Sequence, residues 1–104
     1  MTIRQMELFS VVFEVRNLTR AAEVLFMTQS AVSQNLKKME EEMGVQLFER
    51  NNRQIIPSRA GEIFYVYVKR ILDDFGAAQE AIKQVDEHLA STITPFPHPR
   101  SKTK

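Results

Sequence analysis

Residues 18–43 have the sequence LTRAAEVLFMTQSAVSQNLKKMEEEM, and this stretch decides the fold that we expect. It predicts a short helix, a tight connection and a longer helix. Thr19 is a good N-cap for the first helix, which we expect to run to about Leu25, and Thr28 is a good N-cap for the second. Gly44 follows where a helix C-terminus often needs a positive φ. Two short helices joined in this way predict a helix-turn-helix.

The outward face of the second helix begins with short or uncharged polar side chains. These are Gln29, Ser30, Ser33 and Gln34, and Lys37 and Lys38 follow further along. In a helix-turn-helix that binds DNA, the second helix lies in the major groove with its N-terminal residues at the base edges. Glutamine and serine can hydrogen-bond base edges, whereas the two lysines are placed for phosphates. The alternative is that this face of the helix is exposed to solvent without binding DNA. The helix caps, the Ala21-Ala22 pair and the short side chains favour DNA binding.

A further helix is expected before this pair. Thr2, with Gln5 three residues later, fits a capping box that opens the helix. Arg16-Asn17 is expected to end it, since asparagine readily adopts the left-handed conformation. Its apolar residues form one stripe at helical spacing: Met6, Leu8, Phe9, Val12 and Phe13.

After the helix pair the apolar residues no longer recur at helical spacing, and their new pattern predicts a small β-hairpin. Apolar pieces at 45–48 and 55–56 flank the polar residues 51–54, which begin with two asparagines. Asparagines support the positive φ that a tight turn needs. Pro57 is expected to stop the second strand, and Ser58 can cap a fourth helix.

The longest predicted element is this fourth helix, from about residue 59 to residue 89. Its apolar residues recur at spacings of four and three: Phe64, Val68, Ile71, Phe75, Ala78, Ile82, Val85 and Leu89. Such a repeat is typical of a helix packed along a partner. A straight helix of about 31 residues is roughly 45 Å long, more than a small domain can cover. We therefore expect a homodimer, and the alternative is a stripe packed on the chain's own domain.

Composition argues against several classes of function. The 104 residues contain no cysteine, which excludes a disulfide scaffold and a thiolate metal site. His88 and His98 are expected to be solvated, and no Gly-rich phosphate loop is present. We therefore expect no enzyme activity, no metal and no other cofactor. Since no long apolar run or signal peptide is present, we expect no membrane partner and a cytoplasmic location.

Two further groups are expected to be structural. Glu40, Glu41 and Glu42 predict a solvated helix face, on which Glu40 could pair with a nearby arginine or lysine. Tyr65 and Tyr67 are expected to pack at the base of the fourth helix. Neither group therefore predicts catalysis.

The sequence resembles the N-terminal DNA-binding region of LysR-type transcriptional regulators over residues 2–90. The matching residues are Arg4-Gln5-Met6, Phe9, 18–23, 29–33, Leu36, Glu40, Gly44, 47–50 and Ala60-Gly61. The resemblance implies a winged helix-turn-helix, with the hairpin at 46–57 as the wing and the long helix as a dimerising linker. It implies base contacts by Gln29, Ser33 and Gln34, backbone contacts by Thr28 and Ser30, and phosphate or minor-groove contacts by Arg50 and Arg53.

The sequence also departs from the family pattern. Family members often have Pro in place of Ser30 and Arg in place of Gln34, so one charged base contact is replaced here. They usually carry an α/β effector domain after the linker helix, where this chain has a Pro-rich basic segment at 91–104. We therefore expect no small-molecule effector in this chain. We expect either a DNA-binding fragment or a short form that competes for operators or forms mixed dimers.

Together these features predict a mainly α protein. We expect a winged helix-turn-helix domain at 1–58 with three helices and a β-hairpin, a linker and dimerisation helix at 59–90, and a flexible tail at 91–104. The expected partners are double-stranded operator DNA and a second copy of the chain. The alternative is a protein-interaction module that uses only the heptad helix. Such a module needs neither free polar residues at 29–34 nor arginines on a projecting hairpin.

Overall fold

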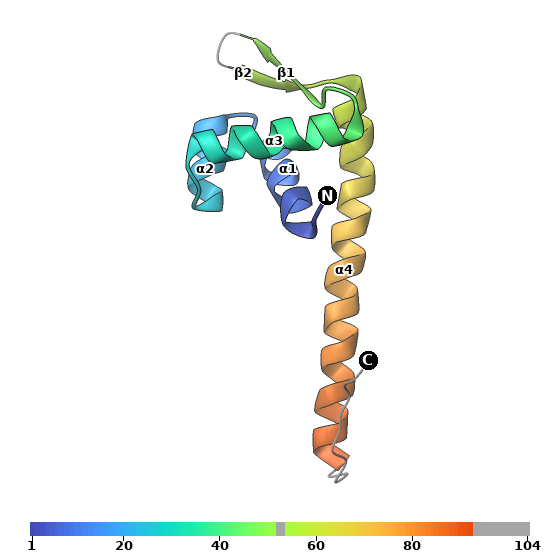
Figure 1. The fold of residues 1–104 in the computed structure, drawn as a ribbon. Helices are drawn as coiled ribbons and strands as arrows, with labels where there is room; N and C mark the ends of the chain where they lie inside the picture. Colours follow the sequence, from blue (N-terminus) through green and yellow to red (C-terminus); the bar gives the residue numbers. More distant parts are fainter. Residues whose placement is uncertain (52–53, 93–104) are drawn as a thin grey trace. The chain divides into compact units, whose positions relative to one another are not determined.

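The computed structural model describes the backbone of residues 1–51 and 54–92, and the side chains of residues 1–50 and 54–85. Its elements, in chain order, are α1 (Ile3–Val15), α2 (Leu18–Leu25), α3 (Gln29–Met43), β1 (Phe48–Asn51), β2 (Gln54–Pro57) and α4 (Arg59–Thr92) (Figure 1). The chain divides into two compact units, Met1–Asp73 and a second that begins at Asp74. The helices and the hairpin confirm the predicted mainly α class.

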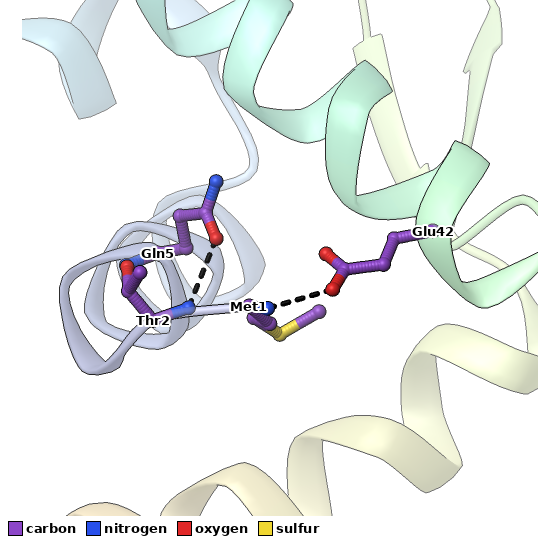
Figure 2. Close-up of polar contacts among 4 residues, drawn as sticks. All are labelled: Met1, Thr2, Gln5 and Glu42. Atoms are coloured by element: carbon purple, nitrogen blue, oxygen red, sulfur yellow. Dashed lines mark hydrogen bonds and ion pairs between the residues drawn. The ribbon is translucent and has the colours of Figure 1, made fainter.

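Helix α1 begins at the predicted capping box (Figure 2). The N–H of Gln5 donates to Oγ1 of Thr2 at 3.1 Å, and Oε1 of Gln5 accepts the N–H of Thr2 at 3.0 Å. These two bonds satisfy N–H groups that the first turn of a helix leaves without intrahelical partners. The amino group of Met1 also lies 2.7 Å from a carboxylate oxygen of Glu42, which joins the start of α1 to the last turns of α3 (Figure 2).

Helix α2 begins earlier than predicted. Its N-cap is Asn17, whose Oδ1 accepts the N–H of Arg20 at 3.0 Å. The prediction of Thr19 as N-cap was wrong because Arg16 itself adopts the left-handed conformation that ends α1, with φ of 60°. That leaves Asn17 extended and free to cap. Thr19 therefore lies in the first turn of α2, where its side chain is exposed.

Helix α3 has the predicted bounds. Oγ1 of Thr28 accepts the N–H of Ala31 at 3.0 Å and caps its start. Gly44 ends it with φ of 75°. The connection from α2 passes through Phe26, which is left-handed at φ of 56° and 96% exposed. The helix pair is therefore held by ordinary caps on both sides of a tight turn.

The core of the first unit lies among α1, α2, α3, the hairpin and the beginning of α4. The ring of Phe9 lies at its centre, 5.4 Å from the ring of Phe48 and 4.9 Å from that of Phe64. The buried apolar residues are Leu8, Phe9, Val12, Ala21, Ala22, Val32, Leu36, Met39, Leu47, Phe48, Ile55 and Val68. They come from all six elements and from the segment before β1, so burial of this cluster fixes the helix pair relative to the hairpin.

Strands β1 and β2 form the expected antiparallel hairpin, with Phe48 opposite Pro57 and Asn51 opposite Gln54. The first strand begins three residues later than the start of the apolar piece at 45–48. The side chains of β2 alternate between the surface and the core, and in β1 Phe48 is buried whereas Glu49 and Arg50 are exposed. We refer to β1, β2 and their connection as the wing.

The segment between α3 and the wing is fixed by a carboxylate. Oε2 of Glu40 accepts the N–H groups of Leu47 and Phe48 at 2.8 and 3.1 Å. Within the described residues this is the role of Glu40, in place of the expected pairing with a basic side chain. The bonds satisfy two backbone donors that precede and open β1, and they hold the wing at the end of α3.

Helix α4 is capped as predicted by Ser58. Its hydroxyl oxygen accepts the N–H of Gly61 at 3.0 Å, and its O–H donates to the carbonyl of Gln46 at 2.6 Å. Gly61 lies against the backbone of Leu47, where an added Cβ is only 2.1 Å from the carbonyl oxygen. A glycine is therefore required for this close approach of α4 to the segment before β1.

Candidate nucleic-acid interface

Helix α3 has one buried face and one exposed polar face. Val32, Leu36 and Met39 have no exposed surface. The predicted contact residues lie elsewhere on the helix: Gln29, Ser30, Gln34, Lys37 and Lys38 are exposed, and Ser33 is half-buried. Intervals of three and four residues place them on one side of the helix. The core thus holds α3 while all six polar side chains stay accessible.

Thr28 caps α3 and also carries a hydroxyl donor that the cap does not use. Its oxygen accepts the N–H of Ala31, and this bond uses the acceptor side of the hydroxyl. A threonine hydroxyl also has one O–H donor. Because the residue is exposed, that donor stays accessible to solvent while the cap is kept. Capping and the predicted backbone contact are therefore compatible.

A groove lies between the starts of α2 and α3 and the wing. Its lining residues are Asn17, Leu18, Thr19, Gln29, Arg50, Gln54 and Ile55. Arg50 lies on β1 opposite Ile55 and is exposed. The groove therefore combines the guanidinium of Arg50 with the hydroxyl of Thr19 on α2 and the amide of Gln29 at the beginning of α3. Arg53, the other predicted wing contact, lies outside the described residues.

Three basic side chains of this surface, Lys37, Lys38 and Arg50, form no ion pair with another described residue. In the described part of the chain, ion pairs join Met1 to Glu42, Arg59 to Glu62 and Lys69 to Glu14. None of them uses Lys37, Lys38 or Arg50. Their charge is therefore not neutralised by a carboxylate of the described residues, and it can attract a polyanion.

A separate polar cluster joins α1 to α4. The hydroxyl of Tyr65 donates to Oε2 of Glu14 at 2.6 Å, and Ser10 donates to the same oxygen at 3.3 Å. The Tyr65 ring stacks on Phe13, with centroids 3.9 Å apart. The bond to Glu14 raises the pKa of Tyr65 to about 12, and burial adds to the effect. Tyr65 thus packs at the base of α4 as predicted, whereas Tyr67 is 55% exposed and does not.

The predicted dimerisation stripe divides between the two units. In the first unit Val68 is fully buried and Phe64 packs against Phe9, so these two fill the chain's own core. Ile71 is 39% exposed. In the second unit the stripe is exposed at Phe75, Ala78, Ile82 and Val85, and the side chain of Leu89 lies outside the described residues. The expected role of Phe64 and Val68 therefore changes from dimer contact to core.

Sequence reasoning missed another exposed apolar set on α4. Ile63 and Val66 are each 49% exposed, and Tyr67 is adjacent to Val66. These residues do not follow the heptad pattern. One signal could have identified this set. Ile63, Tyr67 and Ile71 follow one another at intervals of four residues, which places these three on one helix face.

The described residues contain no group of three or more His, Cys, Asp or Glu side chains that could hold a metal ion. In the same part of the chain, no helix combines the length and the apolar character needed to cross a membrane. The side chains of His88 and His98 lie outside it.

Comparison with known proteins points to one family. Residues 3–62 match the model described as bacterial regulatory helix-turn-helix protein, lysR family. The nitrogen assimilation regulatory protein nac of Klebsiella aerogenes is 35% identical over 94 residues, which cover 90% of this chain and 31% of that protein. The transcriptional regulator BsdA of Bacillus subtilis is also 35% identical over 94 residues, covering 89% and 32%. The chain thus spans about a third of the length of these curated relatives.

Solved structures show the same fold. The BenM DNA-binding domain in complex with benA site 1 DNA has a TM-score of 0.78 at 30% identity, covering 82% of this chain and 99% of that one. The CbnR DNA-binding domain in complex with DNA has a TM-score of 0.79 at 30% identity, covering 83% and 99%. The fold is therefore the winged helix-turn-helix that the sequence predicted.

Proposed function

The chain belongs to the LysR family of bacterial regulatory helix-turn-helix proteins, and from this premise we propose that it binds operator DNA as a homodimer to regulate transcription. In this proposal α3 lies in the major groove. The observation that carries it is the exposed polar side of α3, which lies opposite a fully buried face. The similarity of the fold to DNA-binding domains solved with DNA supports the same assignment.

The side chains of α3 and the wing divide into base and backbone contacts. Gln29, Ser30, Ser33 and Gln34 lie in the first two turns of α3, the part of a recognition helix that reaches base edges. Lys37 and Lys38 lie later in the helix and suit phosphates, as does the hydroxyl of Thr28. Arg50 on β1, with Arg53 beyond it in sequence, contacts a phosphate or the neighbouring minor groove. Base contacts then supply specificity, and the cations supply most of the affinity.

The exposed apolar residues of α4 support a homodimer. Ile82 is 70% exposed, Val85 59% and Phe75 43%, and contiguous exposed apolar surface of this kind marks an interaction site. The repeat of four and three residues suits a second copy of the same helix. A two-fold dimer presents two copies of α3 to successive major grooves about 34 Å apart. The proposal gives the chain a cytoplasmic binding role without a catalytic step, cofactor or effector.

Selection of bound sequences from a random DNA pool tests this function. We expect a two-fold symmetric site whose half-sites lie about one helical turn, roughly 10 base pairs, apart. Affinity for that site should fall steeply between low and physiological salt, because several cations displace counterions from DNA. Recovery of no common sequence, together with weak binding that is independent of salt, contradicts the proposal.

A further inference from the structure

Thr19 and Gln29 meet where the two helices of the helix-turn-helix begin. Oγ1 of Thr19 donates a hydrogen bond to Oε1 of Gln29 at 3.4 Å. We propose that Thr19 is a positioning residue for base readout, which orients the Gln29 carboxamide so that its NH₂ group faces a purine acceptor in the major groove. The inference rests on the proposed DNA binding, and adds to it a second residue and a class of base.

In the described part of the chain, the hydroxyl of Thr19 has no other role in the fold. The start of α2 is capped by Asn17, whose Oδ1 binds the N–H of Arg20. Among the described residues, the Thr19 hydroxyl makes no side-chain hydrogen bond other than that to Gln29. Thr19 is exposed and adds nothing to the buried core. The hydrogen bond to Gln29 therefore affects the orientation of the Gln29 carboxamide more than the stability of the fold.

The pair also lies where a ligand can reach it. Both residues line the groove that continues to Arg50 and Gln54 on the wing. Gln29 is the first residue of α3, and it is exposed. A carboxamide at this position is otherwise free to rotate about several bonds, and every orientation lost on binding costs entropy. A partner on the neighbouring helix reduces that cost before DNA arrives.

The direction of the bond determines what Gln29 can offer. The carboxamide has two lone pairs on Oε1 and two N–H donors on Nε2. Because the Thr19 hydroxyl donates to Oε1, it occupies one lone pair and turns Oε1 towards α2. Both N–H donors stay free. Gln29 therefore meets the DNA chiefly as a hydrogen-bond donor.

A donor at this position favours one kind of base edge. In the major groove guanine presents two acceptors, N7 and O6, whereas adenine presents N7 beside an amino donor and cytosine presents an amino donor. The usual bidentate pairing of glutamine with adenine needs Oε1 to accept as well. With Oε1 held by Thr19, guanine fits the free donors better. Loss of the hydroxyl frees Oε1 and lets the amide turn to accept from adenine or cytosine.

The test compares Thr19→Val and Thr19→Ser with the unchanged chain on the operator selected for that chain. Gln29→Ala first identifies the base position at which discrimination disappears. Duplexes with each of the four bases at that position are then titrated with every variant. We expect Thr19→Val to lower the preference for guanine over adenine and cytosine by about threefold to tenfold, the effect of one hydrogen bond. Thr19→Ser, which keeps the hydroxyl, should retain the preference.

A double-mutant cycle completes the test. If Thr19 acts through Gln29, Thr19→Val should change nothing further in the Gln29→Ala background. An equal loss of affinity on all four duplexes, present in both backgrounds, overturns the inference and indicates a direct phosphate contact by Thr19. An unchanged base preference in Thr19→Val also overturns it. If the unchanged chain binds no sequence preferentially, the proposed function itself fails, and this is known before any variant is compared.

Discussion

The carboxylate of Glu40 accepts the backbone N–H of Leu47 at 2.8 Å and so joins the last turns of α3 to the segment that opens the wing. The same oxygen accepts the N–H of Phe48 at 3.1 Å. Both donors belong to buried residues, so water cannot easily replace the lost acceptor. The helix that is proposed to enter the major groove and the wing beside it are thus linked by one side chain.

We expect Glu40→Ala to destabilise the fold by about 2 kcal/mol, because it leaves two backbone donors near the core without their charged acceptor. Glu40→Gln keeps a neutral acceptor oxygen and should cost about half as much. Urea unfolding followed by circular dichroism measures both. Glu41→Ala is the matched control, since Glu41 is exposed and forms no ion pair with another described residue. Equal midpoints for the two alanine variants contradict the assigned role of Glu40.

The close approach of Gly61 to Leu47 predicts opposite effects at two glycines of the same helix. Gly61→Ala places a Cβ 2.1 Å from a backbone oxygen, so α4 or the segment before β1 must move, at a cost of about 2 kcal/mol or more. Gly76 has no atom within 4 Å of the equivalent position. Gly76→Ala should therefore stabilise the helix by about 0.5–1 kcal/mol. Thermal unfolding compares them, and a Gly61→Ala midpoint at or above that of the parent rules out the steric argument.

Tyr65 predicts a change of stability at high pH. Its pKa in the folded chain is raised to about 12 by the bond to Glu14, above the usual value of 10.0. The bond therefore stabilises the fold fully below pH 10, and its contribution is lost as pH rises through about 12. Tyr65→Phe should cost about 1 kcal/mol at pH 7, and the difference from the parent should vanish towards pH 12. Urea midpoints from pH 7 to pH 11.5 measure this trend, with Tyr67→Phe as the control.

Most of the helical fold could be predicted from local signals. The box at Thr2 and Gln5, the cap at Thr28 and the glycine at 44 each satisfy the backbone within a few residues, and all three were found where expected. The N-cap of α2 was missed because Asn17 and Thr19 are both competent caps two residues apart. The choice depends on the left-handed conformation of Arg16, whose Nε donates to the carbonyl of Phe13 at 2.9 Å.

The features that the sequence did not reveal depend on contacts between distant segments. Glu40 lies in a run of three glutamates, and nothing in that run shows which one turns towards the wing. Val68 and Ile71 are successive apolar positions of one heptad pattern, yet the first is buried in the chain's own core and the second is not. The spacing of apolar residues predicts which face of a helix is apolar. Only the packing of the folded chain shows what covers that face.

The proposed contact of Ser33 with a base edge predicts a loss of DNA binding without a loss of folding. Ser33→Glu places a carboxylate against the acceptor-rich groove, and we expect at least a hundredfold weaker binding of the selected operator. Ala77→Glu adds the same charge at an exposed position of α4 and should bind nearly as the parent does. Gel shift measures affinity, and sedimentation confirms that both variants remain dimers. Unimpaired binding by Ser33→Glu contradicts the placement of α3 in the groove.

The exposed stripe of α4 predicts that charge inserted into it dissociates the dimer. Ile71 and Ile82 lie at stripe positions and are 39% and 70% exposed in the single chain, so aspartate at both is tolerated by the monomer. In a dimer the two carboxylates are buried without partners, at a cost of several kcal/mol. We expect Ile71→Asp with Ile82→Asp to sediment as a monomer and to bind the two-fold operator at least tenfold more weakly.

The control for that variant is Val24→Asp with Val45→Asp, which changes two apolar residues of 57% and 45% exposure outside α4. It carries the same added charge, and it should remain a dimer because neither position belongs to the stripe. Thermal unfolding of both double variants shows whether the monomer is folded. A folded dimer that survives the changes at Ile71 and Ile82 shows that another surface joins the two copies, and the exposed set of Ile63, Val66 and Tyr67 is then the next to be changed.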